Sequence, residues 1–258
     1  NGKASALIVQ RPFRSPHHTV TDVALVGGGS NPQPGEISLA HNGVLFLDEL
    51  PEYKRSALEV MRQPLEDRHI CVTRAKLSVD YPASFMLVAA MNPCPCGHYG
   101  ENNPAHPCTC TPAQIHRYLS RISGPLLDRI DIQCDIQPVP YSLLKDAQPS
   151  ESSATMRERV IKAREIQKNR FISYNATAHS PIHCNAQMTP KMVREYCKLS
   201  DECDRLLAFA MDKMGFSARA YDRILKVART IADLAQSTEI CPPHLLEAIN
   251  YRTLDKMD

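Results

Sequence analysis

Two adjacent carboxylates, Asp48 and Glu49, directly follow a run of four apolar residues at positions 44–47. Such a run is typical of a strand buried in a parallel sheet that helices cover on both faces. Ligands of open α/β sheets bind beyond the carboxyl ends of the strands. There, one carboxylate can hold Mg²⁺ while its neighbour polarises an attacking water. The alternative is a strand that leads into a helix, because an acid before Leu50 and Pro51 also suits a helix start.

Asn92 follows a second apolar run, at residues 85–90, which also indicates a buried strand. If the two strands lie in one sheet, the Asn92 amide projects at the same edge as the acids. An amide there can orient a water molecule or contact a phosphate oxygen. The alternative is an ordinary turn residue, because Asn before Pro93 commonly starts a turn.

Four cysteines form two close pairs, separated by a loop rich in Gly and Pro. The pairs are Cys94 with Cys96, and Cys108 with Cys110. Two such pairs can build a tetrahedral thiolate site for Zn²⁺, although zinc sites more often have two residues between paired ligands. His98 and His106 offer substitute ligands. Reduced free thiols are the alternative, and disulfides are disfavoured in a cytoplasmic protein.

Basic residues gather in two segments that could contact a nucleic-acid backbone. The first is the tip of a hairpin expected from two β-prone runs at residues 70–73 and 77–79. The second is an N-terminal loop. The residues are Arg68, Arg74 and Lys76 at the hairpin, and Arg11, Arg14, His17 and His18 in the loop. The alternative is that these residues are solvated surface charges. No aromatic side chains for base stacking accompany them, so sequence-specific binding is not expected.

The pattern of elements predicts an α/β part followed by an all-helical part. Residues 1–36 are expected to form irregular loop, and Leu58, Met61 and Leu65 have helical spacing. A third strand is expected at residues 130–136. After a polar, Ser-rich segment at residues 148–155, helices are expected at about 156–171, 190–199, 201–214, 218–235 and 243–251.

The bulk composition is that of an ordinary globular protein. The chain has 258 residues and a formal net charge of +2, which argues against a nucleic-acid partner recognised by overall charge. No apolar run approaches the roughly 20 residues that span a bilayer, and no export signal is visible. We therefore expect a cytoplasmic protein without a membrane partner.

Four stretches together carry a resemblance that covers nearly the whole chain. They are RPFRSPHH at residues 11–18, PGEISLAHNG at 34–43, AMNPCPCG at 90–97 and SGPLLDRID at 123–131. In order and spacing they resemble the magnesium-chelatase-like AAA+ ATPases and, among them, the competence protein ComM (YifB-like) family. The resemblance implies an α/β fold with two domains. Residues 1–147 would form an AAA+ P-loop NTPase core with a parallel sheet, including a Cys-rich insertion at 94–110. Residues 148–258 would form a helical lid domain.

The resemblance also implies roles for single residues. Asp48 matches the magnesium-binding Walker B acid, Glu49 the acid that activates water, and Asn92 the sensor of the γ-phosphate. Arg129 matches an arginine finger that reaches the neighbouring subunit's nucleotide, and Arg219 matches the phosphate-sensing arginine of the lid. From the residues alone, the preferred alternatives are an ion pair of Arg129 with Asp128 or Asp131 and a solvated helix position for Arg219.

The function implied by the resemblance is an ATP- and Mg²⁺-dependent motor. It would be a homo-oligomer, a hexameric ring, that translocates on branched or single-stranded DNA during recombination and natural transformation. The basic hairpin and loop would line its pore. One rival is a magnesium-chelatase motor subunit for porphyrin metallation, and another is a non-catalytic module that oligomerises and holds zinc or DNA.

One family motif is missing from the sequence. A phosphate-binding loop needs Gly-x-x-x-x-Gly-Lys followed by Ser or Thr, but Gly2-Lys3 is followed by Ala4 and preceded by one residue. In the family that loop lies upstream, so the chain looks like a fragment that begins within the ATPase domain. We therefore expect this polypeptide alone to bind ATP poorly and to hydrolyse none.

Overall fold

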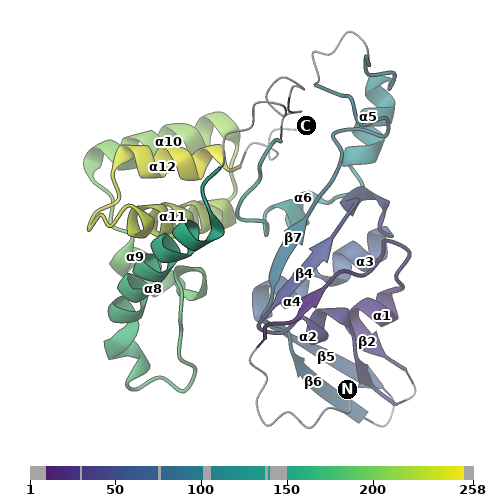
Figure 1. The fold of residues 1–258 in the computed structure, drawn as a ribbon, viewed down its shortest axis with the longest axis horizontal. Helices are drawn as coiled ribbons and strands as arrows, with labels where there is room; N and C mark the ends of the chain where they lie inside the picture. The colour runs from purple at the N-terminus through teal and green to yellow at the C-terminus, as the bar shows by residue number, and fades with distance from the viewer. Residues whose placement is uncertain are drawn as a thin grey trace. The chain divides into compact units, whose positions relative to one another are not determined.

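The computed structural model of the chain describes residues 10–29, 31–74, 77–100, 106–136, 139 and 150–252. The chain folds as two compact units, Asn1–Ile130 and Asp131–Asp258, coloured purple to teal and teal to yellow in Figure 1. The domain boundary predicted between residues 147 and 148 falls outside the described residues and stays a prediction.

A three-stranded parallel sheet organises the first unit. Its strands are β1 (Phe13–Arg14), β4 (Val44–Leu47) and β7 (Met86–Ala89), in the order β1-β4-β7. Leu45 and Leu47 of β4 are fully buried, whereas Val44 and Phe46 are half-buried. The prediction of a parallel sheet is confirmed, but full burial of β4 on both faces is wrong for the described residues. The Phe46 ring stacks on that of Phe13, with ring centroids 6.2 Å apart.

The close approach of β1 and β4 depends on a glycine. The amide of Val44 donates to the carbonyl of Pro12 at 2.9 Å. A Cβ on the preceding Gly43 would lie 1.9 Å from the same Pro12 oxygen, nearer than any side-chain carbon can come. The Gly before the apolar run is therefore required by the neighbouring strand.

Short helices cover the Leu45 face of the sheet. They are α1 (Asp22–Val26), α2 (Glu36–Leu39), α3 (Arg55–Val60) and α4 (Arg62–Asp67). Leu58 and Met61 are buried in this core and Leu65 packs against it, so the predicted helical spacing is confirmed. The helix is broken at Met61 because Pro64 has no N–H to bond the carbonyl four residues before it. The expectation of irregular loop before residue 36 is wrong for α1, which Thr21 caps, and for β1.

The predicted hairpin is present as β5 (His69–Arg74) and β6 (Leu77–Pro82), which pair antiparallel. Arg68 does not lie at its tip, as the sequence had suggested. It ends α4 in a left-handed conformation, with φ 61°, and its carbonyl accepts from Ala83 at the base of the hairpin. The six-residue strand β5 therefore separates Arg68 from Arg74 by roughly 20 Å. In Figure 1 the hairpin lies at the end of the first unit opposite α5.

Three further short elements complete the first unit, together with a two-stranded ribbon of β2 (Gly27–Gly28) and β3 (Gln33–Pro34). They are η1 (Leu50–Glu52), α5 (Pro112–Leu119) and α6 (Gly124–Leu127). Thr111 and Gln114 form a capping box that begins α5. The Thr111 hydroxyl accepts from the Gln114 amide, and the Gln114 side chain accepts from the Thr111 amide, so the start of α5 is well defined.

The second unit is helical, as predicted. It contains α8 (Ser153–Asn175), η2 (Asn185–Gln187), α9 (Pro190–Tyr196), α10 (Asp201–Met214), α11 (Ala218–Leu234) and α12 (Pro242–Asn250). Ser or Thr hydroxyls cap α8, α9, α10 and α11; the predicted starts of α9, α10 and α11 are correct, whereas α8 begins at Ser153, before the predicted start at about residue 156. Phe171, Leu207, Ile224 and Leu245 are among the residues of its core.

The strand predicted at residues 130–136 is wrong. This segment has no regular structure, and Ile132 and Ile136 are 52% and 84% exposed. Its backbone bonds to the end of α12 through Gln133, whose amide donates to the Tyr251 carbonyl at 2.8 Å. Among the described residues this segment therefore has no partner strand in a sheet.

Among the described residues, the helices are too short or too polar to cross a membrane.

Candidate functional site

Asp48 and Glu49 emerge from the end of β4 in a sharp turn. Glu49 has a left-handed backbone, with φ 53° and ψ 48°, and its amide donates to the Asp48 carboxylate at 2.9 Å. Both residues are exposed. A left-handed glutamate is strained, and such strain concentrates at functional sites. The turn ends the strand abruptly and presents both carboxylates to solvent.

Asn92 lies beyond the end of the neighbouring strand. Strands β4 and β7 are parallel, with Leu47 opposite Ala89, and the two chains stay bonded for one residue more, from Ala90 to Leu47 at 2.9 Å. Asp48 follows the first strand and the exposed Asn92 the second, so both leave the same edge of the sheet. The structure thus brings Asp48, Glu49 and Asn92 to one edge, which is the arrangement that the sequence predicted; their individual roles stay predictions.

The N-terminal loop lies against this acidic turn. His18 Nδ1 is 3.0 Å from a carboxylate oxygen of Glu49, and its ring meets that of Tyr53 edge-on at 6.3 Å. The Tyr53 hydroxyl donates to the carbonyl of Pro16 at 2.5 Å. Burial, with the negative charges of Asp48 and Glu49, raises the pKa of Tyr53 to about 12. His18 and Tyr53 therefore form one wall of the acidic site.

Other basic residues of the loop are engaged inside the unit. Arg14 makes a bidentate pair with Glu36, both bonds at 2.6 Å, and the bonds to this carboxylate raise the pKa of Arg14. Arg11 donates to the Asn42 carbonyl at 2.8 Å, and His17 Nδ1 is 3.0 Å from the Thr19 hydroxyl. These contacts hold the loop in place, so a nucleic-acid role for its residues stays a prediction.

Of the three basic residues predicted at the hairpin, the structure describes the side chain of Arg68 only. Arg68 lies at the base, the side chain of Arg74 is outside the described part, and Lys76 is outside the described residues altogether.

Arg129 lies in a groove between α4 and the end of α6. Its guanidinium pairs with Glu66 and donates to the Pro125 carbonyl at 2.7 Å, and its side chain is only 7% exposed. The groove is lined by Glu59, Arg62, Gln63, Glu66, Asp67 and Arg129. The partner shown is thus Glu66, whereas Asp131, which the sequence offered, pairs with Arg223.

Arg219 is an exposed residue in the first turn of α11, in the second unit. Ser217 caps this helix by accepting from the Ala220 amide at 3.2 Å. The predicted start of the helix is therefore correct, and the phosphate-sensing role of Arg219 stays a prediction.

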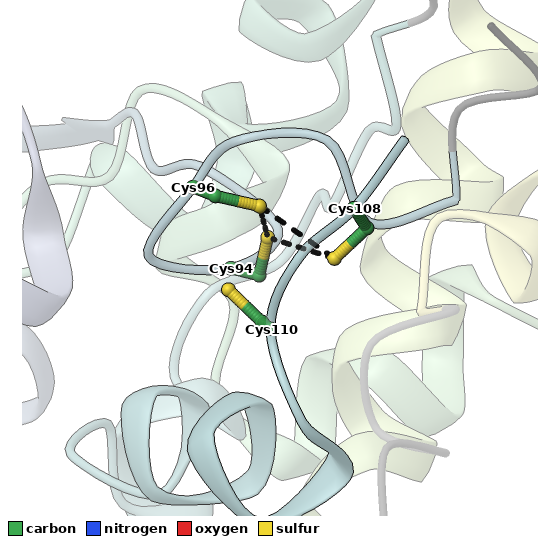
Figure 2. Close-up of side chains that lie close together, drawn as sticks. All are labelled: Cys94, Cys96, Cys108 and Cys110. Carbon is green, nitrogen blue, oxygen red and sulfur yellow. Dashed lines mark hydrogen bonds between the residues drawn. The ribbon is translucent and has the colours of Figure 1, made fainter. Parts of the chain in front are cut away.

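The four cysteines converge in space, as Figure 2 shows. Sulfur separations are 3.4 Å for Cys94 to Cys96, 3.8 Å for Cys94 to Cys108 and 3.6 Å for Cys96 to Cys108. With Cys110, all four sulfurs lie within 4.8 Å of one another. Bonds from the backbone of His98 and Thr109 lower the pKa of Cys96 to about 5, whereas burial raises the pKa of Cys110 to about 12. Four such thiols cannot all ionise side by side unless a cation joins them.

Two residues beside the acidic site were not anticipated. Tyr53 was overlooked, and Arg121 donates to a Glu52 carboxylate at 2.9 Å and to the Pro51 carbonyl at 3.0 Å. Arg121 thereby fixes η1, directly after Glu49. Its distance of 69 residues from Glu52 explains why no local pattern in the sequence could have found this contact.

Comparison with known proteins agrees with this geometry. The family described as magnesium chelatase, subunit ChlI, matches residues 1–144, and the one described as magnesium chelatase, subunit ChlI C-terminal, matches residues 150–252. The chain is 50% identical over 249 residues to the uncharacterized protein YifB of Escherichia coli. It is 49% identical over 250 residues to the competence protein ComM of Haemophilus influenzae. In both cases the match covers 96% of this chain and 46% of the relative.

A third relative is more distant: the chloroplastic magnesium-chelatase subunit ChlI of Chlamydomonas reinhardtii is 24% identical over 155 residues, 59% of this chain and 35% of the relative. The chain spans about half the length of YifB and ComM. Two family models match residues 1–144 and 150–252, and the structure has a parallel sheet with acids at its edge and a helical second unit. The chain therefore belongs to the magnesium-chelatase family of AAA+ proteins.

Proposed function

We propose that the whole protein is an AAA+ ATPase that couples ATP hydrolysis to movement on DNA, as a ring of identical subunits. The observation that carries the proposal is the position of Asp48, Glu49 and Asn92 beyond the ends of two neighbouring parallel strands. At such an edge a carboxylate oxygen can bind a hydrated Mg²⁺, and an amide N–H can donate to a terminal phosphate oxygen.

Each side chain has a proposed task. Asp48 would hold a Mg²⁺ ion bound to the triphosphate, and a cation there would supply neutralisation of the charge on the phosphate oxygens. Glu49 accepts a hydrogen bond from the attacking water and orients it, and Asn92 donates to a γ-phosphate oxygen. His18, 3.0 Å from Glu49, positions this carboxylate.

Two arginines complete the proposed ATP-hydrolysis site. Arg129 of one subunit reaches the nucleotide of the next, where its planar fork stabilises the charge of the transferring phosphoryl group. Arg219, in the first turn of α11, contacts a phosphate near the positive end of that helix. The sequence has no Gly-x-x-x-x-Gly-Lys-Ser/Thr segment. We therefore assign the phosphate-cradling loop to a part of the protein outside these 258 residues.

DNA as the substrate is supported by the degree of similarity to each kind of relative. Identity to a competence protein is 49% over 96% of the chain, against 24% over 59% for a chelatase subunit. Basic residues of the hairpin and the N-terminal loop, Arg74 and Lys76 above all, are the proposed contacts with the DNA backbone. Porphyrin metallation is the rival function, because both family descriptions name a magnesium chelatase.

The test is ATP hydrolysis by the full-length protein, measured with and without forked DNA. We expect DNA to stimulate hydrolysis, and Glu49→Gln to abolish turnover while nucleotide binding persists. The matched control is Glu158→Gln, which changes an exposed carboxylate on α8 and leaves turnover unchanged. Turnover that survives Glu49→Gln would show that another group activates the water. Stimulation by a porphyrin-chelatase partner but not by DNA would favour the rival.

A further inference from the structure

The cysteine cluster is built from two short segments that flank a loop. Cys94 and Cys96 follow the end of β7, and Cys108 and Cys110 precede the Thr111 cap of α5. Cys94 is fully buried and the other three are half-buried. Two segments separated in sequence thus direct four soft ligand atoms to one point, as Figure 2 shows.

The sulfur separations match those of a metal cage. Zinc–sulfur bonds are about 2.3 Å long, so sulfurs at the corners of a tetrahedron lie about 3.8 Å apart. The three separations given for the cluster are 3.4, 3.6 and 3.8 Å. A disulfide would require about 2.05 Å. The single-residue spacing within each pair, unusual for zinc, therefore does not prevent convergence, because each Cys-x-Cys segment turns its two sulfurs to the same side.

We propose that Cys94, Cys96, Cys108 and Cys110 bind one Zn²⁺ ion as a closed, structural tetrathiolate site. Four protein ligands fill a tetrahedral coordination sphere and leave no position for a catalytic water. Thiolate sulfur selects zinc or iron–sulfur chemistry over the harder Mg²⁺, which the carboxylates at the sheet edge suit. The site is thus distinct in chemistry from the proposed nucleotide site of the same unit.

The site has a mechanical consequence. Cys94 lies two residues after Asn92, and Cys110 lies one residue before the N-cap of α5. A metal that joins the two segments ties the end of β7 to the start of α5. The Arg121 side chain, just after α5, in turn bonds Glu52 and the Pro51 carbonyl beside the acidic turn. Zinc therefore braces both flanks of the edge that carries Asn92.

The first test is the metal content of the untagged 258-residue chain, purified under reducing conditions and analysed by mass spectrometry for zinc and iron. We expect about one zinc per chain. The variants Cys94→Ser and Cys108→Ser should lose it, whereas Cys71→Ser, which changes an exposed cysteine on the hairpin of the same unit, should retain it. A reduced chain without zinc, or zinc retained when Cys94 and Cys108 are both replaced, would overturn the proposal. Iron with sulfide in its place would overturn the choice of metal.

A second test avoids variants that fail to fold. The unsubstituted chain is stripped with a chelator and titrated with Co²⁺, whose visible absorption reports the number of thiolate ligands. Four-thiolate spectra that Zn²⁺ displaces support the proposal. Spectra typical of two or fewer thiolates, or no uptake by a chain that circular dichroism shows to be folded, contradict it.

Discussion

At the scale of single residues, the conformation of Glu49 links structure to activity. Its backbone is left-handed, with φ 53°, although a glutamate prefers negative φ. Glu49→Gly and Glu49→Ala both remove the carboxylate, but only glycine tolerates this backbone without strain. We expect the glycine variant of the chain to be more stable than the alanine variant by about 1 kcal/mol. Urea denaturation measures the difference; an alanine variant of equal or greater stability would mean that Glu49 is not held in this conformation.

Tyr53 gives a prediction about pH. Burial first, then the charges of Asp48 and Glu49, raise the pKa of Tyr53 from 10.0 to about 12. Because the unfolded chain ionises at the lower pH, the stability that the neutral phenol contributes is complete below pH 10 and is lost as pH rises to about 12. Tyr53→Phe should therefore cost roughly 1 kcal/mol at pH 7, through its lost bond to Pro16, and reduce the loss above pH 10.

The check for Tyr53 is the difference in unfolding free energy between the two proteins, measured from pH 7 to 11. Other tyrosines also titrate in this range, but they are common to both proteins and cancel in the difference. A difference that stays constant with pH would show that Tyr53 ionises alike in the folded and unfolded chain.

At the scale of elements, a buried charge network joins three parts of the second unit. Asp233 of α11 is fully buried and accepts from Arg170 of α8, from Arg229 at 3.1 Å and from Asn185 of η2 at 2.8 Å. Asp233→Asn leaves the buried Arg229 and the half-buried Arg170 without their counter-charge, so we expect a loss of about 3 kcal/mol or more. The control, Asp212→Asn at an exposed position of α10, should change stability by less than about 0.5 kcal/mol. Chemical denaturation of the whole chain compares them, and similar losses in both would mean that the network contributes little.

The elements that were predictable from the sequence are those with a local signal. Strand β4 follows from a short apolar run, and α10 begins after Ser200 and ends at Gly215, both local cues. The strand expected at residues 130–136 failed because a strand also needs a neighbour, which no local pattern reveals. Arg68 was misplaced because its left-handed backbone, which ends α4 and moves it to the base of the hairpin, has no signature in its residue type.

The residues of the candidate site also divide into those that the sequence predicted and those that only the fold reveals. Asp48 and Asn92 were predictable because each follows its own apolar run, and parallel pairing places such ends together. The contact of Arg121 with Glu52, and that of Tyr53 with Pro16 across 37 residues, join parts of the chain that only the fold brings together. A single sequence contains the chemistry of the site but not the residues that hold it in position.

At the scale of the whole molecule, the position of Arg129 bears on how subunits would cooperate. Its guanidinium pairs with Glu66, whose side chain is 49% exposed. Arg129 itself is only 7% exposed and also donates to the Pro125 carbonyl, so its guanidinium must leave both partners to contact a phosphate. An arginine that acts on the neighbouring subunit's nucleotide would leave each active site dependent on two chains.

Mixing two inactive full-length variants tests this dependence. Glu49→Gln removes the proposed water activator and Arg129→Ala the proposed finger, so rings of either variant alone should not hydrolyse ATP. In randomly mixed rings, a subunit with Glu49 intact meets a neighbour with Arg129 intact at about one quarter of the interfaces, and we expect activity near that fraction of the unsubstituted protein. If Arg129 instead served its own subunit's nucleotide, every chain would lack one of the two groups and mixing would restore nothing. Subunit exchange, verified by fluorescence energy transfer between labelled chains, is the control that makes a negative result decisive against action between subunits.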